Sequence, residues 1–125
     1  MDEQNVYEHK QRIIQELVPG KQITLAHIIA NPDDILYKKL GLDPSIDYSK
    51  NKCAIGLVTM SPAEYAIIGA DLAIKKSAAT LGFVDRFSGT LIVTGTVSEV
   101  EASLAAVTEY AQRALGFKVC EITRT

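Results

Sequence analysis

The chain has 125 residues, of which 47% are apolar and 22% are charged, and its net charge at pH 7 is -2. This is the length of one domain, large enough to bury a core without disulfides or structural metals. The small net charge excludes the basic surface of a nucleic-acid-binding protein, and the apolar runs are too short to cross a membrane. The polar start lacks the apolar segment of a secretory signal, and Cys53 and Cys120 lack a CxxC spacing. We therefore predict a cytoplasmic protein with two reduced thiols.

The N-terminal third is predicted to hold two strands and a short helix. Residues 12–20, RIIQELVPG, are a short strand-like run ended by a Pro-Gly pair, and residues 22–30 are rich in β-branched side chains. Asn31 then favours an N-cap. This predicts a helix that continues to about Leu40 and ends at Gly41.

The middle of the chain is predicted to hold a loop, a buried strand and a helix. Residues 42–52 are polar and without periodicity, which predicts a surface loop. Residues 54–60 form a continuous apolar run, which is typical of a buried strand. Ser61 and Glu64 then predict a capping box that starts a helix. The helix is expected to bury one face, made of Ala63, Ala66, Ile67, Ala70 and Ile74.

The C-terminal part is predicted to begin with two strands and a long helix. Residues 80–86 and 90–95 are strand-like, and the turn DRFSG, residues 85–89, joins them. Ser98 and Glu101 predict a second capping box. The helix after it is expected to bury Val100, Leu104, Val107, Ala111 and Leu115 and to end at Gly116.

The order of these elements predicts a fold class. From residue 54 onward the order is strand, helix, strand, strand, helix, strand, with the last strand over residues 117–125. This is the order of a ferredoxin-like α+β fold, in which helices pack on one face of a four-stranded antiparallel sheet. We predict that this unit is complete by itself and that residues 12–41 are added in front of it.

Few residues with catalytic or metal-binding chemistry occur at useful spacings. His9 and His27 share no ligand spacing with a cysteine or a carboxylate, and the mid-strand position of His27 favours a hydrogen-bonded core or interface histidine. Asp33 and Asp34 fall in the first turn of a helix, where the helix dipole explains acidic residues without catalysis. No nucleophile elbow surrounds Ser88. The sequence therefore predicts no catalytic residue, no cofactor and no metal.

The turn DRFSG allows two interpretations. Asp85 and Arg86 occupy successive strand positions and point to opposite faces, so they do not pair across one face. Charges at a hairpin tip are usually solvated and contribute little. Alternatively, Arg86, Phe87 and Ser88 lie where several subunits meet around a symmetry axis.

Long segments of the chain resemble bacterial microcompartment shell proteins. The resemblance rests on AIGLVTMSPAEYAIIGADLAIKKSA, residues 54–78, and GFVDRFSGTLIVTGTVSEVEASLAAV, residues 82–107. LAHIIANPDDILYKKLG, residues 25–41, resembles the segment that closes the chain in the usual members, but here it comes first. The chain is therefore similar to the circularly permuted class of ethanolamine-, propanediol- and choline-utilisation compartments.

The resemblance implies a structural role without catalysis. Members of the family form cyclic homohexamers that tile with other shell proteins into a wall around aldehyde-producing enzymes. By position, Arg86, Phe87 and Ser88 match a pore loop at the sixfold axis, and Lys75 matches a lysine at the edge between hexamers. The expected partners are copies of this chain, other shell proteins and the enclosed enzymes.

The resemblance also divides the chain into an N-terminal extension, residues 1–20, and a permuted shell domain, residues 21–125. Residues 12–18 resemble a segment that forms a six-stranded β-barrel over the axis in permuted relatives. A short strand has two unpaired edges, and six copies that close on themselves remove those edges. The residues expected in this axial barrel are Ile13, Ile14, Gln15, Glu16 and Leu17.

Three departures from the family pattern bear on the shape of the ring. Eleven residues precede the barrel segment, residues 43–52 form a long loop, and Cys53 stands where a small residue is usual. A contact between unlike surfaces closes into a ring or continues as an open helix. A flat ring, a bent ring and an open helical assembly therefore all remain possible from the sequence.

Two other functions remain open from the sequence. Ferredoxin-like domains often oligomerise, so the chain is also compatible with a regulatory module that binds a small metabolite between subunits. An acylphosphatase-like hydrolase would need an arginine in a phosphate-binding loop after the first strand. The segment TMSPAE, residues 59–64, has no arginine there, so the hydrolase is the weaker alternative.

Overall fold

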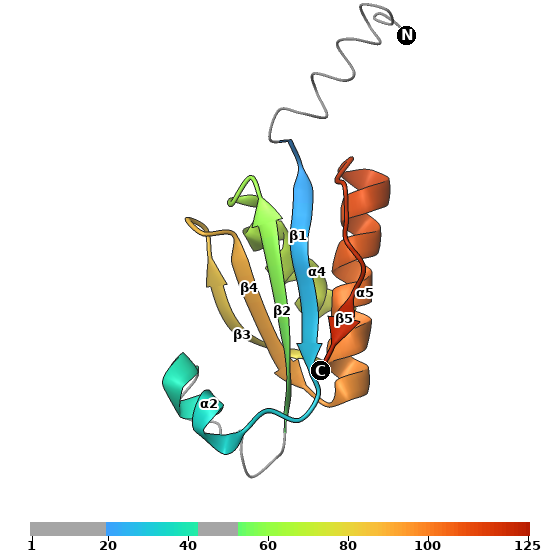
Figure 1. The fold of residues 1–125 in the computed structure, drawn as a ribbon. Coiled ribbons are helices and arrows are strands. Elements are labelled where there is room, and N and C mark those ends of the chain that lie inside the picture. The colour runs from blue at the N-terminus through green and yellow to red at the C-terminus, as the bar shows by residue number, and fades with distance from the viewer. Residues whose placement is uncertain (1–19, 43–52) are drawn as a thin grey trace, which may run out of the picture.

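The computed structural model describes residues 20–42 and 53–125, which form an α+β fold around one sheet (Figure 1). The sheet has five strands in the spatial order β3-β4-β2-β1-β5. Neighbouring strands are antiparallel, except that β5 runs parallel to β1. The strands are β1 (Gln22–Ile29), β2 (Ala54–Ser61), β3 (Thr80–Asp85), β4 (Thr90–Gly95) and β5 (Thr123–Arg124).

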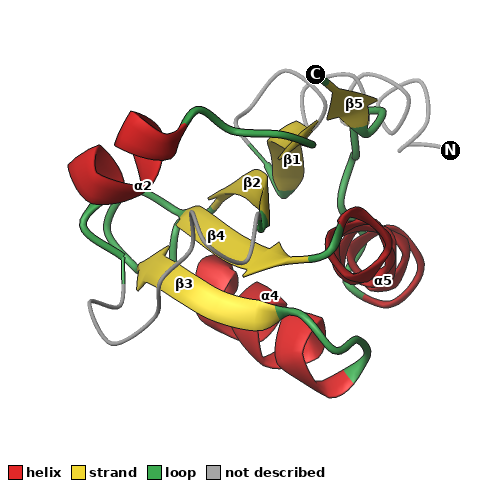
Figure 2. Ribbon diagram, turned by 90° about the horizontal axis from the view of Figure 1, so that it is seen from below, coloured by secondary structure: helices red, strands yellow, loops and turns green. Residues whose placement is uncertain are grey.

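Helices lie on both faces of the sheet within the described ranges. α4 (Tyr65–Lys75) and α5 (Val97–Ala114) pack side by side on one face. α2 (Asp34–Leu40) lies on the opposite side and covers only one end of the sheet, as the view along the strands shows (Figure 2). Much of that second face is therefore not covered by a helix.

The position of β1 corrects the expected topology. β1 pairs with β2 over its whole length, from Gln22 opposite Ser61 to Ile29 opposite Ile55. It therefore takes the place beside β2 that the closing strand of a ferredoxin-like unit would fill. The prediction that the segment from residue 54 onward is complete by itself is wrong. The fourth strand comes from the N-terminal side, as a circular permutation of this fold requires.

The closing segment of the chain pairs with the outer edge of β1 instead of with β2. Only Thr123–Arg124 forms a strand there, so the strand predicted over residues 117–125 is mostly absent. Near the other end of β1, Gln22 forms a bridge with Lys118, and the Ile23 N–H donates to the Lys118 carbonyl oxygen at 2.8 Å. The C-terminal segment thus covers the edge of β1 at both of its ends.

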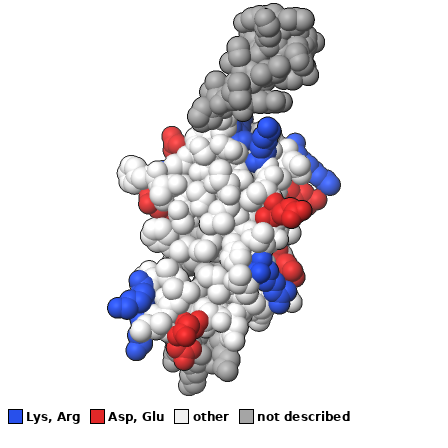
Figure 3. All heavy atoms as spheres, in the orientation of Figure 1, with Lys and Arg blue, Asp and Glu red and all other residues white. Residues whose placement is uncertain are grey.

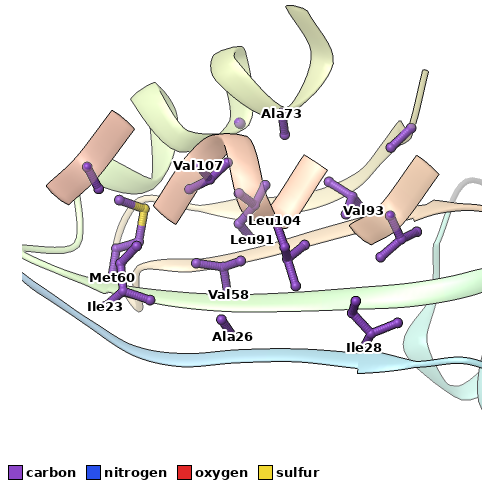
Figure 4. Packing of buried hydrophobic residues seen from close by; sticks show 14 of the residues in the cluster. Ile23, Ala26, Ile28, Val58, Met60, Ala73, Leu91, Val93, Leu104 and Val107 are labelled. Carbon is purple, nitrogen blue, oxygen red and sulfur yellow. The ribbon is translucent and has the colours of Figure 1, made fainter. Parts of the chain in front are cut away.

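Successive side chains of β2 point to opposite faces of the sheet and contribute to two different apolar cores. Val58 and Met60 point toward α4 and α5, where they meet Leu104 and Val107 in the main core (Figure 4). Ile55 is one of the residues that point the other way, into a smaller core formed with α2. The sheet is therefore buried on both sides at the α2 end and on one side elsewhere.

The start of α2 lies further along the chain than predicted. The backbone remains extended through Asp33, and the Asp33 Oδ1 accepts a hydrogen bond from the Ile35 N–H at 3.1 Å. Asp33 is therefore the N-cap, and the prediction of Asn31 is wrong. The helix ends at Gly41 as predicted, because Gly41 adopts a left-handed conformation with φ of 64°.

α4 begins without a side-chain cap, so the predicted capping box of Ser61 and Glu64 is wrong. β2 continues through Ser61, which keeps this hydroxyl away from the free N–H groups of the helix. Backbone carbonyls replace it. The Tyr65 N–H donates to the Pro62 carbonyl oxygen at 3.1 Å, and the Ile67 N–H donates to Glu64 at 3.1 Å.

The outward face of α4 is also different from the prediction. Ala66 and Ala70 are buried as expected, but Ile67 and Ile74 are 52% and 47% exposed. The helix approaches the sheet through its small residues instead. A Cβ added at Gly69 would lie only 2.9 Å from the Met60 Sδ. The close approach leaves no room for bulky side chains on the inner face.

α5 is close to the predicted helix but starts with a different cap. Thr96 and Glu99 form the capping box, since the Glu99 N–H donates to Thr96 Oγ1 at 3.1 Å and the Thr96 N–H donates to Glu99 Oε1 at 2.9 Å. The predicted box of Ser98 and Glu101 is wrong. Leu115 is only partly buried because it lies at the C-cap. The other predicted core residues, Val100, Leu104, Val107 and Ala111, are buried.

Candidate functional site

The turn between β3 and β4 is held by short-range hydrogen bonds. The Asp85 carboxylate accepts from the Phe87 N–H at 2.9 Å, and the Asp85 carbonyl oxygen accepts from the Gly89 N–H at 2.9 Å. The Ser88 hydroxyl donates to the Thr90 Oγ1 at 3.0 Å. These bonds satisfy the polar groups of the turn locally and give it one defined shape.

Gly89 seats this turn against the end of β2. Its φ of 78° favours glycine, and a Cβ there would clash with the Met60 carbonyl oxygen and lie 3.1 Å from the Ala63 Cα. The Gly89 carbonyl oxygen accepts a hydrogen bond from the Met60 N–H at 2.8 Å. The turn therefore lies beside the segment that leads into α4.

The turn displays an aromatic ring and two charges to solvent. Phe87 is 80% exposed, and the Arg86 guanidinium carbon lies 5.0 Å from the centre of the Phe87 ring. The N–H of Phe87 and the hydroxyl and N–H of Ser88, together with the nearby Arg86 charge, lower the pKa of Asp85. Among the described residues, no group of three or more His, Cys, Asp and Glu side chains gathers at the turn.

Lys75 lies at the far end of α4 from this turn. It is the last residue of the helix, and its Nζ lies 2.9 Å from the Asp71 Oδ2 on the same exposed face. An α-helix rises 1.5 Å per residue, so the 11 residues of α4 extend over about 16 Å. The turn and Lys75 are thus separate features at opposite ends of one helix.

The predicted axial-barrel residues lie outside the described residues. These are Ile13, Ile14, Gln15, Glu16 and Leu17. The predicted surface loop lies there too, except for Leu42, which is described and buried. The described residues begin at residue 20, just before β1.

His27 has structural partners, which confirms the hydrogen-bonded role predicted for it. Its Nδ1 lies 2.6 Å from the Thr123 Oγ1, and its Nε2 lies 2.9 Å from the Thr125 Oγ1. Both ring nitrogens are therefore engaged with β5 and the residue after it. Sequence analysis missed this contact, although the Thr-x-Thr spacing of residues 123–125 is the alternation that puts two hydroxyls on one side of a strand.

Cys53 and Cys120 are both free thiols, as predicted. Burial, and to a smaller extent the charge of Glu99, raises the pKa of Cys53. The Tyr37 hydroxyl donates to the Cys53 carbonyl oxygen, and burial likewise raises the pKa of Tyr37. Cys53 thus favours its neutral form and serves the smaller core beside α2.

Residues of metal-site type do not gather anywhere in ranges 20–42 and 53–125, where no group of three or more His, Cys, Asp and Glu comes together. In the same ranges no helix has the length and apolar character needed to cross a membrane.

Comparison with known proteins gives consistent matches. The family model of the BMC domain matches residues 54–123. The bacterial microcompartment shell protein PduU of Salmonella typhimurium is 49% identical over 114 residues, which cover 91% of this chain and 93% of PduU. A solved structure described as the CutR flat hexamer, form 1, matches with a TM-score of 0.77 and 42% identity and covers 86% of this chain and 94% of that chain.

A second form of CutR is nearly as similar. The structure described as the CutR screw with a 41.9 Å pitch has a TM-score of 0.75 and 42% identity, over 86% of this chain and all of that chain. These relatives are shell proteins, and the match extends over nearly their whole length. The chain therefore belongs to the BMC-domain family of bacterial microcompartment shell proteins, and it is a structural component of such a shell rather than an enzyme.

Proposed function

We propose that six copies of this chain form a closed ring and that the rings tile into the wall of a bacterial microcompartment. The match to the CutR flat hexamer over 94% of that chain carries this proposal. Family membership favours the wall over the metabolite-binding module and the hydrolase considered from the sequence. CutR is also known in a screw form, so an open helix is the alternative arrangement of the same contacts.

The turn of Arg86, Phe87 and Ser88 is assigned to the sixfold axis. Its support is the combination of the hydrogen bond that fixes the turn to Met60 and the exposed Phe87 at its tip. Six copies of the tip would surround an opening whose width depends on Phe87 and whose charge depends on Arg86 and Asp85. With this assignment, the turn helps to determine which molecules pass through the wall.

Lys75 is assigned to the perimeter of the ring. If the turn lies on the axis, the start of α4 lies near the axis too, because Ala63 adjoins Gly89. α4 then runs outward, and Lys75 at its other end reaches the boundary with a neighbouring ring. The Asp71 carboxylate beside Lys75 orients its ammonium group there.

The N-terminal extension, residues 1–20, is assigned to a β-barrel over the axis, with residues 21–125 as the shell domain. Its support is where the chain enters the sheet. Gln22, at the start of β1, lies opposite Ser61, the neighbour of Met60, which bonds to the turn (Figure 1). The segment of Ile13, Ile14, Gln15, Glu16 and Leu17 therefore leads into the sheet at the end proposed to face the axis.

The wall is proposed to enclose enzymes that produce a volatile aldehyde, together with other shell proteins as partners. Support comes from the resemblance to shell proteins of propanediol, ethanolamine and choline utilisation. Expression of the chain with each of these three enzyme sets, followed by purification of intact compartments, tests which set is enclosed.

Native mass spectrometry and electron microscopy test the ring and its edge. We expect a species of six copies, and sheets or tubes of rings at high concentration. Lys75→Ala should leave the six-copy species intact and reduce the sheets, whereas Lys39→Ala on α2 should change neither. A protein that stays monomeric at high concentration would contradict the ring, and unchanged sheets of the Lys75→Ala variant would contradict the edge assignment.

A further inference from the structure

Two exposed apolar surfaces lie on opposite sides of the described sheet. We call the first the α4 ridge and the second the sheet-face patch. The α4 ridge consists of Ile67, Ile68 and Ile74. The sheet-face patch consists of the exposed Leu25 and Phe83 and the half-buried Leu57, with Thr59 and Thr90 between them. Leu57 lies at the border of the smaller core beside α2.

Strand register shows that the members of the sheet-face patch share one side. Residues directly opposite each other in antiparallel strands project to the same face. Leu25 lies opposite Thr59, and Thr59 lies opposite Thr90. In the next row, Leu57 and Phe83 both lie opposite Ile92. This face is turned away from α4 and α5, because the alternate residues of β2 point to those helices.

The sheet-face patch is largely apolar, and the one imidazole on it, His27 opposite Leu57, is hydrogen-bonded to Thr123 and Thr125. Phe83 is 44% exposed, and Leu25 is also exposed. Figure 3 shows this side of the molecule, with a broad area over the strands that carries neither acidic nor basic side chains. An antiparallel sheet with one open face usually presents polar residues to water, so this face is unusual for a monomer.

The α4 ridge has a similar character on the opposite flank. Its bulky side chains point outward because the small residues of α4 occupy the inner face. The charges beside it, Asp71 and Lys75, form an ion pair at 2.9 Å and largely cancel one another. Burial of the ridge between Ile67 and Ile74 would therefore leave no unpaired charge in the contact.

We propose that the α4 ridge of one subunit packs on the sheet-face patch of the next subunit in the ring; this inference rests on the proposed function. A closed ring needs two unlike, complementary surfaces on each subunit. The ridge and the patch are unlike and lie on opposite flanks. Asp71 on the ridge is paired with Lys75, and Asp85 borders the patch opposite Thr90. The occupant of the sheet-face patch is thus a second copy of this chain.

Both surfaces also reach the turn assigned to the axis. Phe83 lies on β3 just before Asp85, where the turn begins, and Ile67 lies in the first turn of α4 beside the segment that contacts Gly89. A contact that starts at the axis and follows α4 outward ends at Ile74. Lys75, the next residue, then lies at the outer end of the contact, where it keeps its ion pair with Asp71 and faces a neighbouring ring.

Two single variants test which surfaces meet. Ile67→Glu adds a charge to the ridge and leaves the patch intact, whereas Phe83→Glu does the reverse. We expect each variant alone to be monomeric in native mass spectrometry. An equimolar mixture should give a dimer with one copy of each variant and nothing larger, because only one intact ridge and one intact patch remain and the two altered surfaces repel one another.

Controls separate this proposal from the ring itself. Ile35→Glu on α2 alters a side chain that is 59% exposed and belongs to neither surface, so it should form rings like the unaltered chain. Ile68→Glu and Leu25→Glu repeat the test, and circular dichroism confirms that each variant is folded. Rings formed by both single variants, or folded monomers whose mixture gives no dimer, would overturn the inference. An unaltered chain that forms no ring would instead overturn the proposed function.

Discussion

α4 and α5 pack on the same face of the sheet but use their side chains in opposite ways. α5 buries its large residues, such as Leu104 and Val107, and turns its charged residues to solvent. α4 buries Ala66, Gly69 and other small residues and turns its isoleucines outward. One helix is built for the core of the subunit, whereas the other keeps its apolar side chains for a surface outside it.

Shortening one large side chain in each helix tests this difference between α4 and α5. Leu104→Ala should reduce the free energy of unfolding by about 2–5 kcal/mol, because it leaves a cavity in the core. Ile74→Ala should change it by less than about 0.5 kcal/mol in the monomer, because Ile74 is exposed. Urea unfolding at two protein concentrations checks this. A cost of Leu104→Ala that is no larger than that of Ile74→Ala would contradict the difference between the helices.

Gly89→Ala tests how tightly the turn is joined to the start of α4. The left-handed backbone of Gly89 and the clash with the Met60 carbonyl oxygen should together cost about 1–3 kcal/mol of unfolding free energy. Thermal unfolding measures the loss. Gly41→Ala is the matched control, because Gly41 has a positive φ but no atom within 4 Å of an added Cβ. Equal losses in the two variants would show that the clash at Gly89 has no effect.

The start of α5 can be tested by removing one hydroxyl at a time. Thr96→Ala should destabilise the protein by about 1 kcal/mol, because it leaves the Glu99 N–H without its side-chain partner. Ser98→Ala, inside the first turn, should change stability by less than about 0.5 kcal/mol. Denaturant midpoints of both variants distinguish the observed capping box from the predicted one, and the opposite ranking would restore Ser98 as the cap.

Acid should loosen the turn between β3 and β4, with the smallest effect of the four. The folded protein lowers the pKa of Asp85 below the ordinary value of 3.8. The carboxylate therefore stabilises the turn above that value, and this contribution is lost as the pH falls through the lower pKa of the folded state. Carbon NMR titration of the Asp85 carboxyl group should give a midpoint below 3.8. A midpoint at or above that value would contradict the hydrogen bonds described for the turn.

Much of the fold follows from sequence patterns that depend on local chemistry. The apolar run of β2, the end of α2 at Gly41 and the buried stripe of α5 are all as predicted. The N-caps are wrong by two or three residues because several residues that can cap stand in a row. Which one meets the free N–H groups depends on where the preceding backbone stops being extended, as Asp33 and Thr96 show.

The errors of larger scale have a different cause. The sequence pattern of α4 marks apolar side chains but does not distinguish buried from exposed ones, so the prediction that Ile67 and Ile74 are buried is wrong. The alternation of small and bulky residues in α4 is the signal that could have identified this. Similarly, the predicted closing strand is too long, because β1 occupies the place beside β2 that this strand would fill. The composition of the turn, in contrast, correctly indicates its exposed tip.

The cover on the edge of β1 matters for a component of a protein shell. A bare strand edge offers unpaired N–H and C=O groups to any other chain and can seed fibres. Here the bridge at Lys118 and the short β5, tied to His27 by two threonine hydroxyls, occupy that edge. Neighbouring copies therefore have fewer free backbone groups to pair with at this edge, and contacts between them form through side chains. Side-chain contacts can select one arrangement of subunits, whereas backbone pairing would extend the sheet from copy to copy.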